Sequence, residues 1–413
     1  MVGAVEFDLL NLLLVLTLAW AGGTLTERLG YPAMMGELLV GLLFGPPLLG
    51  LLHGGVALDI FAELGVFLLM VYVGMEIDIH DLFDLGPQAL VVAVGAFVLP
   101  FILGYVSGVL TIATTEGALF LGLAMAATSL ATKSRILVDL ELLDTRIAGI
   151  LLGGALVSDV GVLVVFAGVI GFIQAGSVNV TDIVSVMGKA LAFFIITLVI
   201  GDRFLPILWS RLDRLLEEYG FVDKTSAFTL ALLVALFFAE LATIAGLHMI
   251  IGGFMAGLFL HQADLEPELY EHMYNVIYDL AIGFFAPIFF VSVAFDLTLD
   301  VFTRSLGLLI LLIVIAFVGK IVGSWVSALP TQLTSREGLV IGFGMNGRGT
   351  VEIIIASVGL SAGIITQELF SVLVFIAIFT TALVPVTVKW GVDWVEQAGE
   401  LVRIDREDGS NAE

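Results

Sequence analysis

The sequence predicts an all-α, polytopic membrane protein, and three observations support that prediction. Of the 413 residues, 60% are hydrophobic and only 13% carry a charged side chain, about half the charged share of a soluble domain. The apolar residues recur in continuous runs of about 20, the length of a helix that crosses a hydrocarbon layer ~30 Å thick. Polar and apolar positions do not alternate within the runs, so helices are predicted rather than the strands of a barrel.

Thirteen helices are predicted along the chain, separated by turn signals such as Gly30-Tyr31-Pro32, Gly86-Pro87 and Pro330. The first run lacks a positively charged leader and a small-residue cleavage site, so it is predicted to be a true span rather than a signal peptide. The boundary near Ala245 has the weakest turn signal, and one long helix there would reverse the orientation of all later helices. The predicted ranges are 7–26, 33–51, 58–78, 86–111, 115–136, 146–174, 183–206, 224–244, 246–263, 273–295, 303–328, 336–360 and 364–389.

The distribution of Lys and Arg predicts the orientation of these helices, because cytoplasmic loops carry an excess of both. With the N-terminus outside, the outer side holds only Arg304 and Lys189. The cytoplasmic loops and the C-terminal segment then hold Arg28, Lys133, Arg135, Arg146, Arg203, Arg211, Arg214, Lys224, Arg336, Lys389, Arg403 and Arg406. We therefore expect a cell-membrane protein with its N-terminus outside and its C-terminus in the cytoplasm.

Two segments are predicted, a transmembrane domain over residues 1–390 and a short acidic cytoplasmic tail over 391–413. The tail is too short for a C-terminal nucleotide-binding domain, which needs about 100 residues. The net charge of −23 makes nucleic acid an implausible partner. The acidic loops fit either ordinary solvated loops or an organism with a salty cytoplasm, and both interpretations remain open. The chain contains no cysteine, so disulfides and thiol chemistry are excluded.

A few charged residues fall inside predicted spans, where a charge is costly and therefore a functional candidate. Asp159 and Lys320 have no partner on their own helices, so we expect them to face each other or a water-filled cavity. Arg348 and Glu352 are spaced i, i+4 and can form a structural ion pair that holds a broken helix. Glu240 lies toward a helix end and is interpreted as structural.

Two predicted helices, the fifth and the twelfth, contain interruptions. The fifth contains Thr128, Ser129 and further hydroxyl residues, and the twelfth contains Asn346 among four glycines between positions 342 and 349. Irregular backbone at membrane depth is tolerated only beside a cavity, where half-helix ends help to bind ions. The two helices have opposite predicted orientations, as in an inverted repeat with two discontinuous helices that cross at the middle of the membrane.

These residues predict competition between a proton and a small cation at one buried carboxylate. Either of them stabilises the carboxylate of Asp159, and both cannot do so fully at once. Ser158, Thr128 and Ser129 can supply further oxygen ligands to Na⁺ or K⁺, and Lys320 can offset the charge of Asp159 when the site is empty. No catalytic triad, metal-spaced cluster or phosphate-binding loop stands out, so neither an enzyme nor a cofactor is predicted.

Several segments, in order and in register with the predicted helices, resemble the Kef-type and Nap-type branch of the monovalent cation:proton antiporter superfamily. The resemblance covers nearly all of residues 7–389. The matching segments are Tyr31–Gly41 with Phe44-Gly45-Pro46, Gly65–Asp78, Leu143-Asp144-Thr145 leading to Ser158-Asp159, Gly252–Gly257, Phe284–Val293, and Gly344–Gly349 with Glu352.

The resemblance implies a homodimer in which a core domain, made of helices 4–6 and 11–13, moves like an elevator against a dimerisation domain. It implies an ion site built by helices 5, 6, 11 and 12. Asp159 matches the ion-binding aspartate, Thr128 the broken-helix threonine, and Lys320 the family lysine. Electrogenic members carry two adjacent aspartates, whereas this chain has Ser158 at the first position, which favours one-for-one, electroneutral exchange.

The predicted function is therefore Na⁺/H⁺ antiport that serves pH homeostasis, in a chain of prokaryotic origin. A K⁺/H⁺ antiporter of the same fold is the nearest alternative. A Na⁺-coupled organic-anion symporter and a non-transporting ion sensor also remain open.

Overall fold

A computed structural model describes residues 8–77, 86–112, 114–175, 224–262 and 267–403, with the isolated residues 188, 192, 193 and 197. Every regular element in these ranges is a helix, so the predicted all-α class is confirmed. Seven described helices are long and apolar enough to cross a membrane, or up to eight if one bent pair forms a single span. The count of thirteen stays a prediction, because most of the predicted helix 183–206 lies outside the described residues.

The chain divides into two compact units, and each is described by itself. The first comprises the described residues within Met1–Leu25, Ala33–His80 and Leu163–Leu297. The second comprises those within Thr26–Pro32, Asp81–Val162 and Thr298–Glu413.

The first unit is built on close packing of α3 against α11 and of α13 against α2 and α3. At the contact of α3 with α11, a Cβ on Gly74 would lie 2.1 Å from the carbonyl oxygen of Phe254, so only glycine fits. The helices of this unit are α1 (Leu9–Arg28, through Leu25), α2 (Ala33–Phe44), α3 (Val56–Met75), α10 (Lys224–Ile244), α11 (Met249–Gln262), α12 (Pro267–Tyr278), the π-helix η1 (Asp279–Phe285) and α13 (Ala286–Phe295), with the second half of α8 (Arg146–Ala175).

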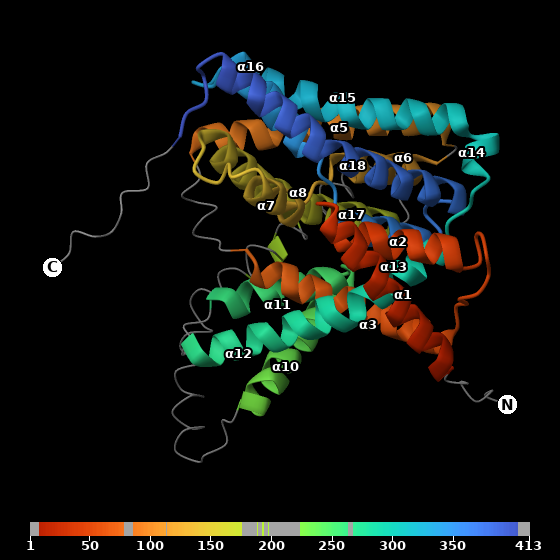
Figure 1. Ribbon diagram of the computed structural model, residues 1–413. Coiled ribbons are helices and arrows are strands. Elements are labelled where there is room, and N and C mark those ends of the chain that lie inside the picture. The colour runs from red at the N-terminus through yellow and green to blue at the C-terminus, as the bar shows by residue number, and fades with distance from the viewer. Residues whose placement is uncertain are drawn as a thin grey trace. The chain divides into compact units, whose positions relative to one another are not determined.

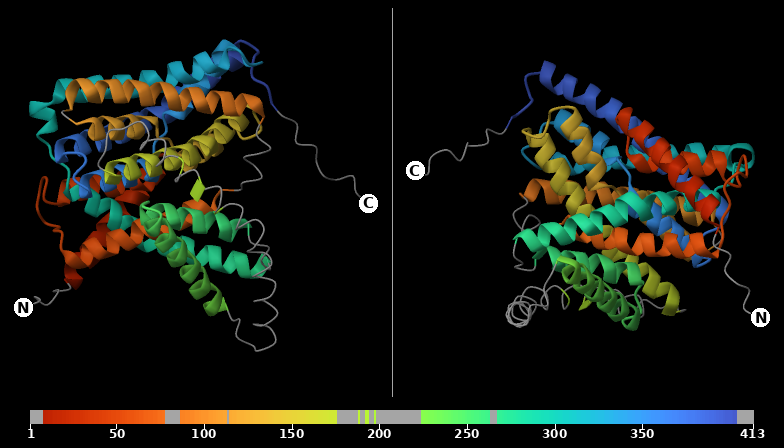
Figure 2. Two further views of the ribbon diagram at one scale, coloured as in Figure 1. Left: turned by 180° about the vertical axis from the view of Figure 1, so that it is seen from behind. Right: turned by 60° about the horizontal axis from the view of Figure 1, so that its bottom comes forward.

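The second unit packs α5 against α6 and α15, and α16 against α15 and α18. Figures 1 and 2 show α5 and α15 side by side, and a Cβ on Gly323 would lie 2.3 Å from the carbonyl oxygen of Gly95. This unit contains α5 (Pro87–Thr111), α6 (Thr115–Ala126), α7 (Leu130–Asp139), the first part of α8, α14 (Val301–Arg304), α15 (Leu306–Ala328), α16 (Ser335–Met345), α17 (Thr350–Ser361) and α18 (Gln367–Gln397).

Three predicted helix boundaries are wrong. The helix predicted over 273–295 begins earlier, at Pro267. The helix predicted over 33–51 ends at Phe44, because the following Pro46 and Pro47 have no amide hydrogen to donate to a continuing helix. The helix predicted over 364–389 continues to Gln397, so the first residues of the predicted tail belong to α18. The weak boundary near Ala245 is present: α10 ends at Ile244, and Gly246 has a φ of +77° in the turn that follows.

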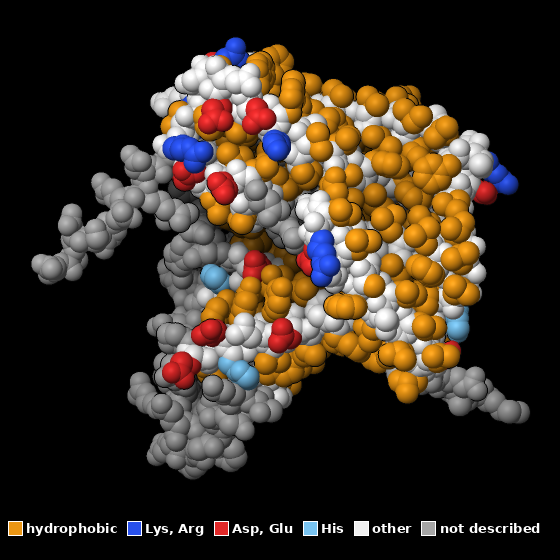
Figure 3. Space-filling model, in the orientation of Figure 1, with side chains coloured by type: hydrophobic (Ala, Val, Ile, Leu, Met, Phe, Trp, Pro, Cys, Tyr) orange, Lys and Arg blue, Asp and Glu red, His pale blue; other side chains and the backbone are white. Residues whose placement is uncertain are grey.

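The outward face of α15 is apolar. Ile310, Leu311, Val314 and Val318 are all about half exposed, and Figure 3 shows the hydrophobic side chains that cover this face. A broad apolar surface of this kind is stable against hydrocarbon rather than water. The helix is therefore suited to face lipid, as its mean hydropathy indicates.

Candidate functional site

Both predicted helix breaks are present, and both lie in the second unit. The first separates α6 from α7 at residues 127–129, where Ala127 and Ser129 have extended backbone. The second separates α16 from α17 at residues 346–349, and the two half-helices are bent by 49°. Hydroxyl residues mark the first break and glycines the second, because glycines weaken a continuous helix and hydroxyls offer other hydrogen bonds to the backbone.

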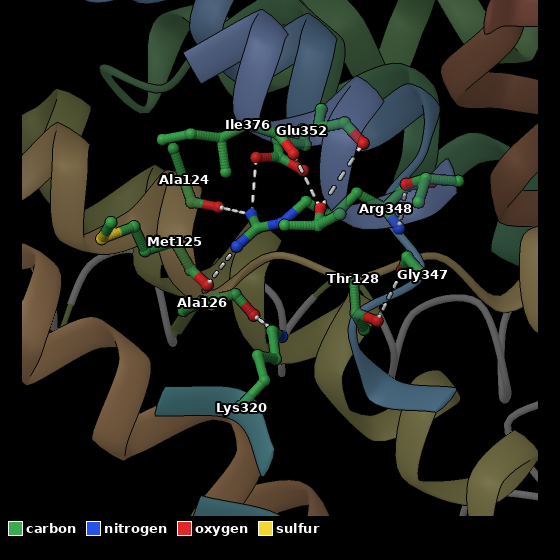
Figure 4. A network of polar contacts seen from close by, with 12 residues as sticks. Ala124, Met125, Ala126, Thr128, Lys320, Gly347, Arg348, Glu352 and Ile376 are labelled. Carbon is green, nitrogen blue, oxygen red and sulfur yellow. Dashed lines mark hydrogen bonds and ion pairs between the residues drawn. The ribbon is translucent and has the colours of Figure 1, made fainter. Parts of the chain in front are cut away.

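The two breaks are hydrogen-bonded to each other. The amide of Ser129 donates to the carbonyl oxygen of Gly347 at 3.0 Å. The Thr128 hydroxyl lies 3.0 Å from the carbonyl oxygens of both Met345 and Gly347, and its single proton is shared between them. Figure 4 shows Thr128 directed at Gly347. Residues more than 200 positions apart therefore form one structural centre.

The crossing leaves no room for a side chain at Gly349. A Cβ there would lie 2.3 Å from Ser129 Oγ and 2.5 Å from Ser129 Cβ. The glycine-rich sequence of the second break is thus explained by a close approach to the first break.

Cationic side chains lie at the carboxyl-terminal end of α6. Arg348 donates from Nη1 to the carbonyl oxygen of Ala124 at 2.7 Å and from Nη2 to that of Met125 at 3.1 Å. Lys320, on α15, donates to the carbonyl oxygen of Ala126 at 2.5 Å (Figure 4). The last carbonyls of a helix have no partner within it and carry partial negative charge, so these contacts stabilise the broken helix inside the unit.

The carboxylate of Asp159 lies at the opposite kind of helix end. Its Oδ2 accepts a hydrogen bond of 3.2 Å from the amide of Leu130, the first residue of α7. The helix amino terminus carries partial positive charge and favours an anion at this position. Asp159 comes from α8 and is only 5% exposed.

Two oxygen atoms beside this contact have no donor. Asp159 Oδ1 and Ser158 Oγ are buried and make no hydrogen bond within the described part of the chain. Most buried polar atoms in proteins have a partner, so unpartnered oxygens at this buried carboxylate are available to a proton, a water or a cation. Both residues were predicted as ion ligands from the sequence.

The predicted ligand Ser129 and the predicted structural residues Asn346 and Glu240 lie as follows. Ser129 Oγ accepts from the amide of Thr132 at 3.4 Å and caps α7. Asn346 donates from Nδ2 to the carbonyl oxygen of Gly342 at 2.9 Å, while its Oδ1 has no donor among the described residues. Glu240 is exposed on α10 in the first unit.

Arg348 and Glu352 form the ion pair that their spacing predicts. Arg348 Nη1 lies 2.6 Å from Glu352 Oε1, and both side chains are buried. The backbone amide of Arg348 also donates to Thr381 Oγ1, on α18, at 2.9 Å. The guanidinium therefore connects α17 to the end of α6, a positioning role for the second break.

Lys320 and Asp159 were expected to face each other or a water-filled cavity, and that expectation stays a prediction. Lys320 is fully buried and donates to Ala126, and no ion pair links it to Asp159 in the described residues. Asp159 interacts electrostatically with two lysines, Lys320 and Lys133, and more strongly with Lys133.

Lys133 is the site residue that the sequence analysis missed, and its predicted place in a cytoplasmic loop is wrong. It lies on α7 and is fully buried. Its Nζ donates to Thr128 Oγ1, to the Ser129 carbonyl oxygen at 2.8 Å and to the Gly347 carbonyl oxygen at 3.4 Å. The available signal was its position four residues after Ser129, which places it within one turn of the break.

Comparisons with known proteins agree with this architecture. The family model described as sodium/hydrogen exchanger, transmembrane, matches residues 13–394. The Na⁺/H⁺-K⁺ antiporter GerN of Bacillus cereus is 32% identical over 386 residues, which cover 93% of this chain and 96% of GerN. A Na⁺/H⁺ antiporter of Enterococcus hirae is 27% identical over 379 residues, which cover 92% of this chain and 96% of that protein.

A solved structure has the same fold. The sodium proton antiporter MjNhaP1 of Methanocaldococcus jannaschii superimposes with a TM-score of 0.68 at 18% sequence identity, covering 94% of this chain and 96% of MjNhaP1. The relatives are named as transporters rather than enzymes. With an all-helical membrane fold and a family match over nearly its whole length, the chain belongs to the sodium/hydrogen exchanger family of monovalent cation:proton antiporters.

Proposed function

We propose that this protein exchanges a monovalent cation, with Na⁺ as the first candidate, for H⁺, and that the two compete for Asp159. The single observation that carries the proposal is the state of that carboxylate. It is buried, one oxygen is held by the start of α7, and the other has no hydrogen-bond donor in the described residues. A buried carboxylate in this condition is stabilised by either a proton or a cation.

The oxygen ligands that a cation needs are available nearby. Asp159 Oδ1 and Ser158 Oγ lack donors within the described ranges, and Thr128 supplies a hydroxyl at the crossing of the breaks. Hard monovalent cations bind oxygen atoms that replace their hydration shell. Because occupancy by either ion neutralises the carboxylate, the site can cross the apolar interior only when it is filled, and competition becomes exchange.

The division of the chain supports an elevator-type movement of the site. The helices predicted to form the moving core, numbers 4–6 and 11–13, fall in the second unit except for the later part of α8. The proposal includes a homodimer in the cell membrane, in which the first unit supplies the dimerisation domain. It also includes an outside N-terminus and a cytoplasmic C-terminus.

K⁺ is a second candidate for the transported cation. One relative, 32% identical, is named as a Na⁺/H⁺-K⁺ antiporter. The choice between the two ions depends on small differences in cavity size and ligand number.

Proton flux in proteoliposomes tests the proposal. The full chain is reconstituted with a pH-sensitive dye inside, and Na⁺, K⁺ or Li⁺ is added outside. We expect at least one of these ions to move protons, and Asp159→Asn to abolish the signal, because the amide cannot exchange a proton for a cation. Lys389 is exposed on α18, so the variant Lys389→Gln serves as the control and should transport as the wild type does. Full flux in Asp159→Asn, or no flux in the wild type with any of the three ions, would refute the mechanism.

A further inference from the structure

An arginine and a glutamate join the first turns of two helices that build the ion site. Arg146 is the first residue of α8, which carries Asp159, and Glu337 lies in the first turn of α16, which ends at the second break. Arg146 donates from Nε to Glu337 Oε1 at 3.0 Å and from Nη2 to Glu337 Oε2 at 2.5 Å. The side chain of Glu337 is 0% exposed and that of Arg146 26%. A bidentate pair of this kind fixes orientation as well as distance.

The start of α16 holds the glutamate in place. The backbone amide of Thr334 donates to Glu337 Oε2 at 2.8 Å, and the amide of Glu337 donates to the Thr334 hydroxyl at 3.2 Å. These reciprocal hydrogen bonds form a capping box. The capping box therefore sets the direction in which the carboxylate meets Arg146.

The two helices also pack against each other between this pair and the ion site. A Cβ on Gly344 of α16 would lie 2.6 Å from the side chain of Leu151 of α8. Asp159 follows Arg146 by 13 residues along the same helix, about 20 Å at 1.5 Å per residue. Because a packed helix transmits a shift along its length, movement of Arg146 against Glu337 displaces Asp159 against the second break.

The chain that follows α18 returns to the start of α8. The backbone amide of Arg146 donates to the carbonyl oxygen of Val402 at 3.0 Å, and Thr145 and Arg403 form an antiparallel bridge. Arg403 Nη1 also donates to both carboxylate oxygens of Asp144, at 2.9 and 2.7 Å. The first amides of a helix have no acceptor within it, so Val402 satisfies a donor that the start of α8 leaves open.

The same segment reaches the start of α16. Arg336, the residue before Glu337, donates from Nη1 to Glu400 Oε1 at 2.7 Å. Leu401 packs against the hydrophobic core of the second unit. Residues 400–403, which we name the C-terminal strap, therefore contact the first turns of both helices and hold them together.

We infer that Arg146 is a positioning residue of the ion site and that the C-terminal strap keeps it in place. The pair of Arg146 and Glu337 sets the register of α8 against α16, and with it the distance between Asp159 and the second break. The strap acts on the site through Arg146. The inference rests on the proposed antiport function and extends its machinery to the starts of α8 and α16.

The test measures the apparent KM for the cation in the proteoliposome assay, with whichever alkali ion drives flux in the wild type. Arg146→Lys keeps the charge but loses the planar fork that binds both carboxylate oxygens, so KM should rise by about tenfold. Arg403→Gln removes the ion pair of the strap with Asp144 and should raise KM by about threefold. The matched control is Arg304→Gln, which removes an exposed pair with Asp300 in the same unit and should leave KM at the wild-type value.

Two readouts separate positioning from simple stabilisation. The double variant Arg146→Lys, Arg403→Gln should have the KM of Arg146→Lys alone, because the strap acts through Arg146. Effects that multiply in the double variant would contradict this role of the strap. A wild-type KM in Arg146→Lys, together with a lower unfolding temperature in detergent, would make the pair a structural element and overturn the inference.

The strap variant decides alone if Arg146→Lys does not fold, as judged by size-exclusion chromatography. Both partners of the Arg403 pair are about half exposed, so its loss is compatible with folding. A raised KM in Arg403→Gln then supports the inference, and a wild-type KM rejects it. Loss of flux in Asp159→Asn together with wild-type KM values in the arginine variants would reject this inference alone and leave the antiport proposal intact. Full flux in Asp159→Asn would instead refute the proposed function.

Discussion

Replacing Gly349 by alanine is expected to separate the two helix breaks. The new Cβ would lie 2.3 Å from Ser129 Oγ, and ordinary contact begins at 3.4 Å, so these atoms must move apart by about 1.1 Å. A new rotamer of Ser129 does not relieve the contact, because its Cβ would also lie too close, at 2.5 Å. The φ of −159° at Gly349 is accessible to alanine, so the effect comes from space alone.

The expected cost has two parts. Overpacking in a tight core lowers the free energy of unfolding by about 1–3 kcal/mol. A displacement of about 1 Å at a site that positions reacting groups reduces the rate by about 100-fold. The displacement acts directly on the Ser129 amide, which donates to Gly347, and on the neighbouring Leu130 amide, which donates to Asp159. Transport should therefore fall by about 100-fold in a protein that still folds, since a loss of about 1–3 kcal/mol is smaller than the usual stability of a native protein.

Cation-driven proton flux in proteoliposomes and thermal unfolding in detergent measure the two parts separately. Gly149→Ala is the matched control, since it lies on the helix that carries Asp159 and a Cβ there meets no atom within 4 Å. It should keep wild-type flux. Wild-type rate and KM in Gly349→Ala would refute the idea that the close crossing holds the site in its working geometry.

Three further outcomes are expected. Glu352→Gln leaves the buried guanidinium of Arg348 without its carboxylate partner. It should lower the free energy of unfolding in detergent by about 3–5 kcal/mol. Unchanged stability would show that the ion pair is dispensable. Ser158→Asp adds a second carboxylate and should shift the reversal potential of transport, and a wild-type value would contradict the one-carboxylate argument for electroneutral exchange. The backbone amide of Asn11 donates to the exposed Asp8 and lowers the pKa of its carboxyl group below the ordinary value. The ionised carboxylate therefore stabilises the fold above its unfolded pKa, and this stabilisation is lost as the pH falls through the lower folded pKa. Asp8→Asn should therefore flatten the acid limb of stability against pH, and an unchanged limb would count against this contribution.

The hydrophobic runs and the interrupted helices were predictable because both depend on local sequence. A run of about 20 apolar residues favours a lipid-spanning helix whatever its neighbours are. The glycines around Asn346 and the hydroxyls of Thr128 and Ser129 weaken a helix in the same local way, and both breaks are present. The spacing of Arg348 and Glu352 was sufficient to indicate their ion pair, because i, i+4 residues share a helix face.

The helix ends that were wrong depended on weaker local signals. Hydropathy continued past Phe44 and stopped before Gln397, while the actual ends followed from the prolines after Phe44 and from the packing of α18. Residues Val388, Val392 and Val395 on that last helix are buried in the core of the second unit, which extends the helix beyond the apolar run.

The sequence by itself therefore determined the fold class, the two breaks and Asp159 as the buried carboxylate. Only the tertiary structure decided which oxygen meets which ammonium. Lys320 contacts Ala126, and Lys133 lies inside the crossing rather than in a loop. The physical reason is that a charge in a sequence carries no information about its partner when that partner lies some 200 residues away, and only helix packing brings such atoms within hydrogen-bond distance.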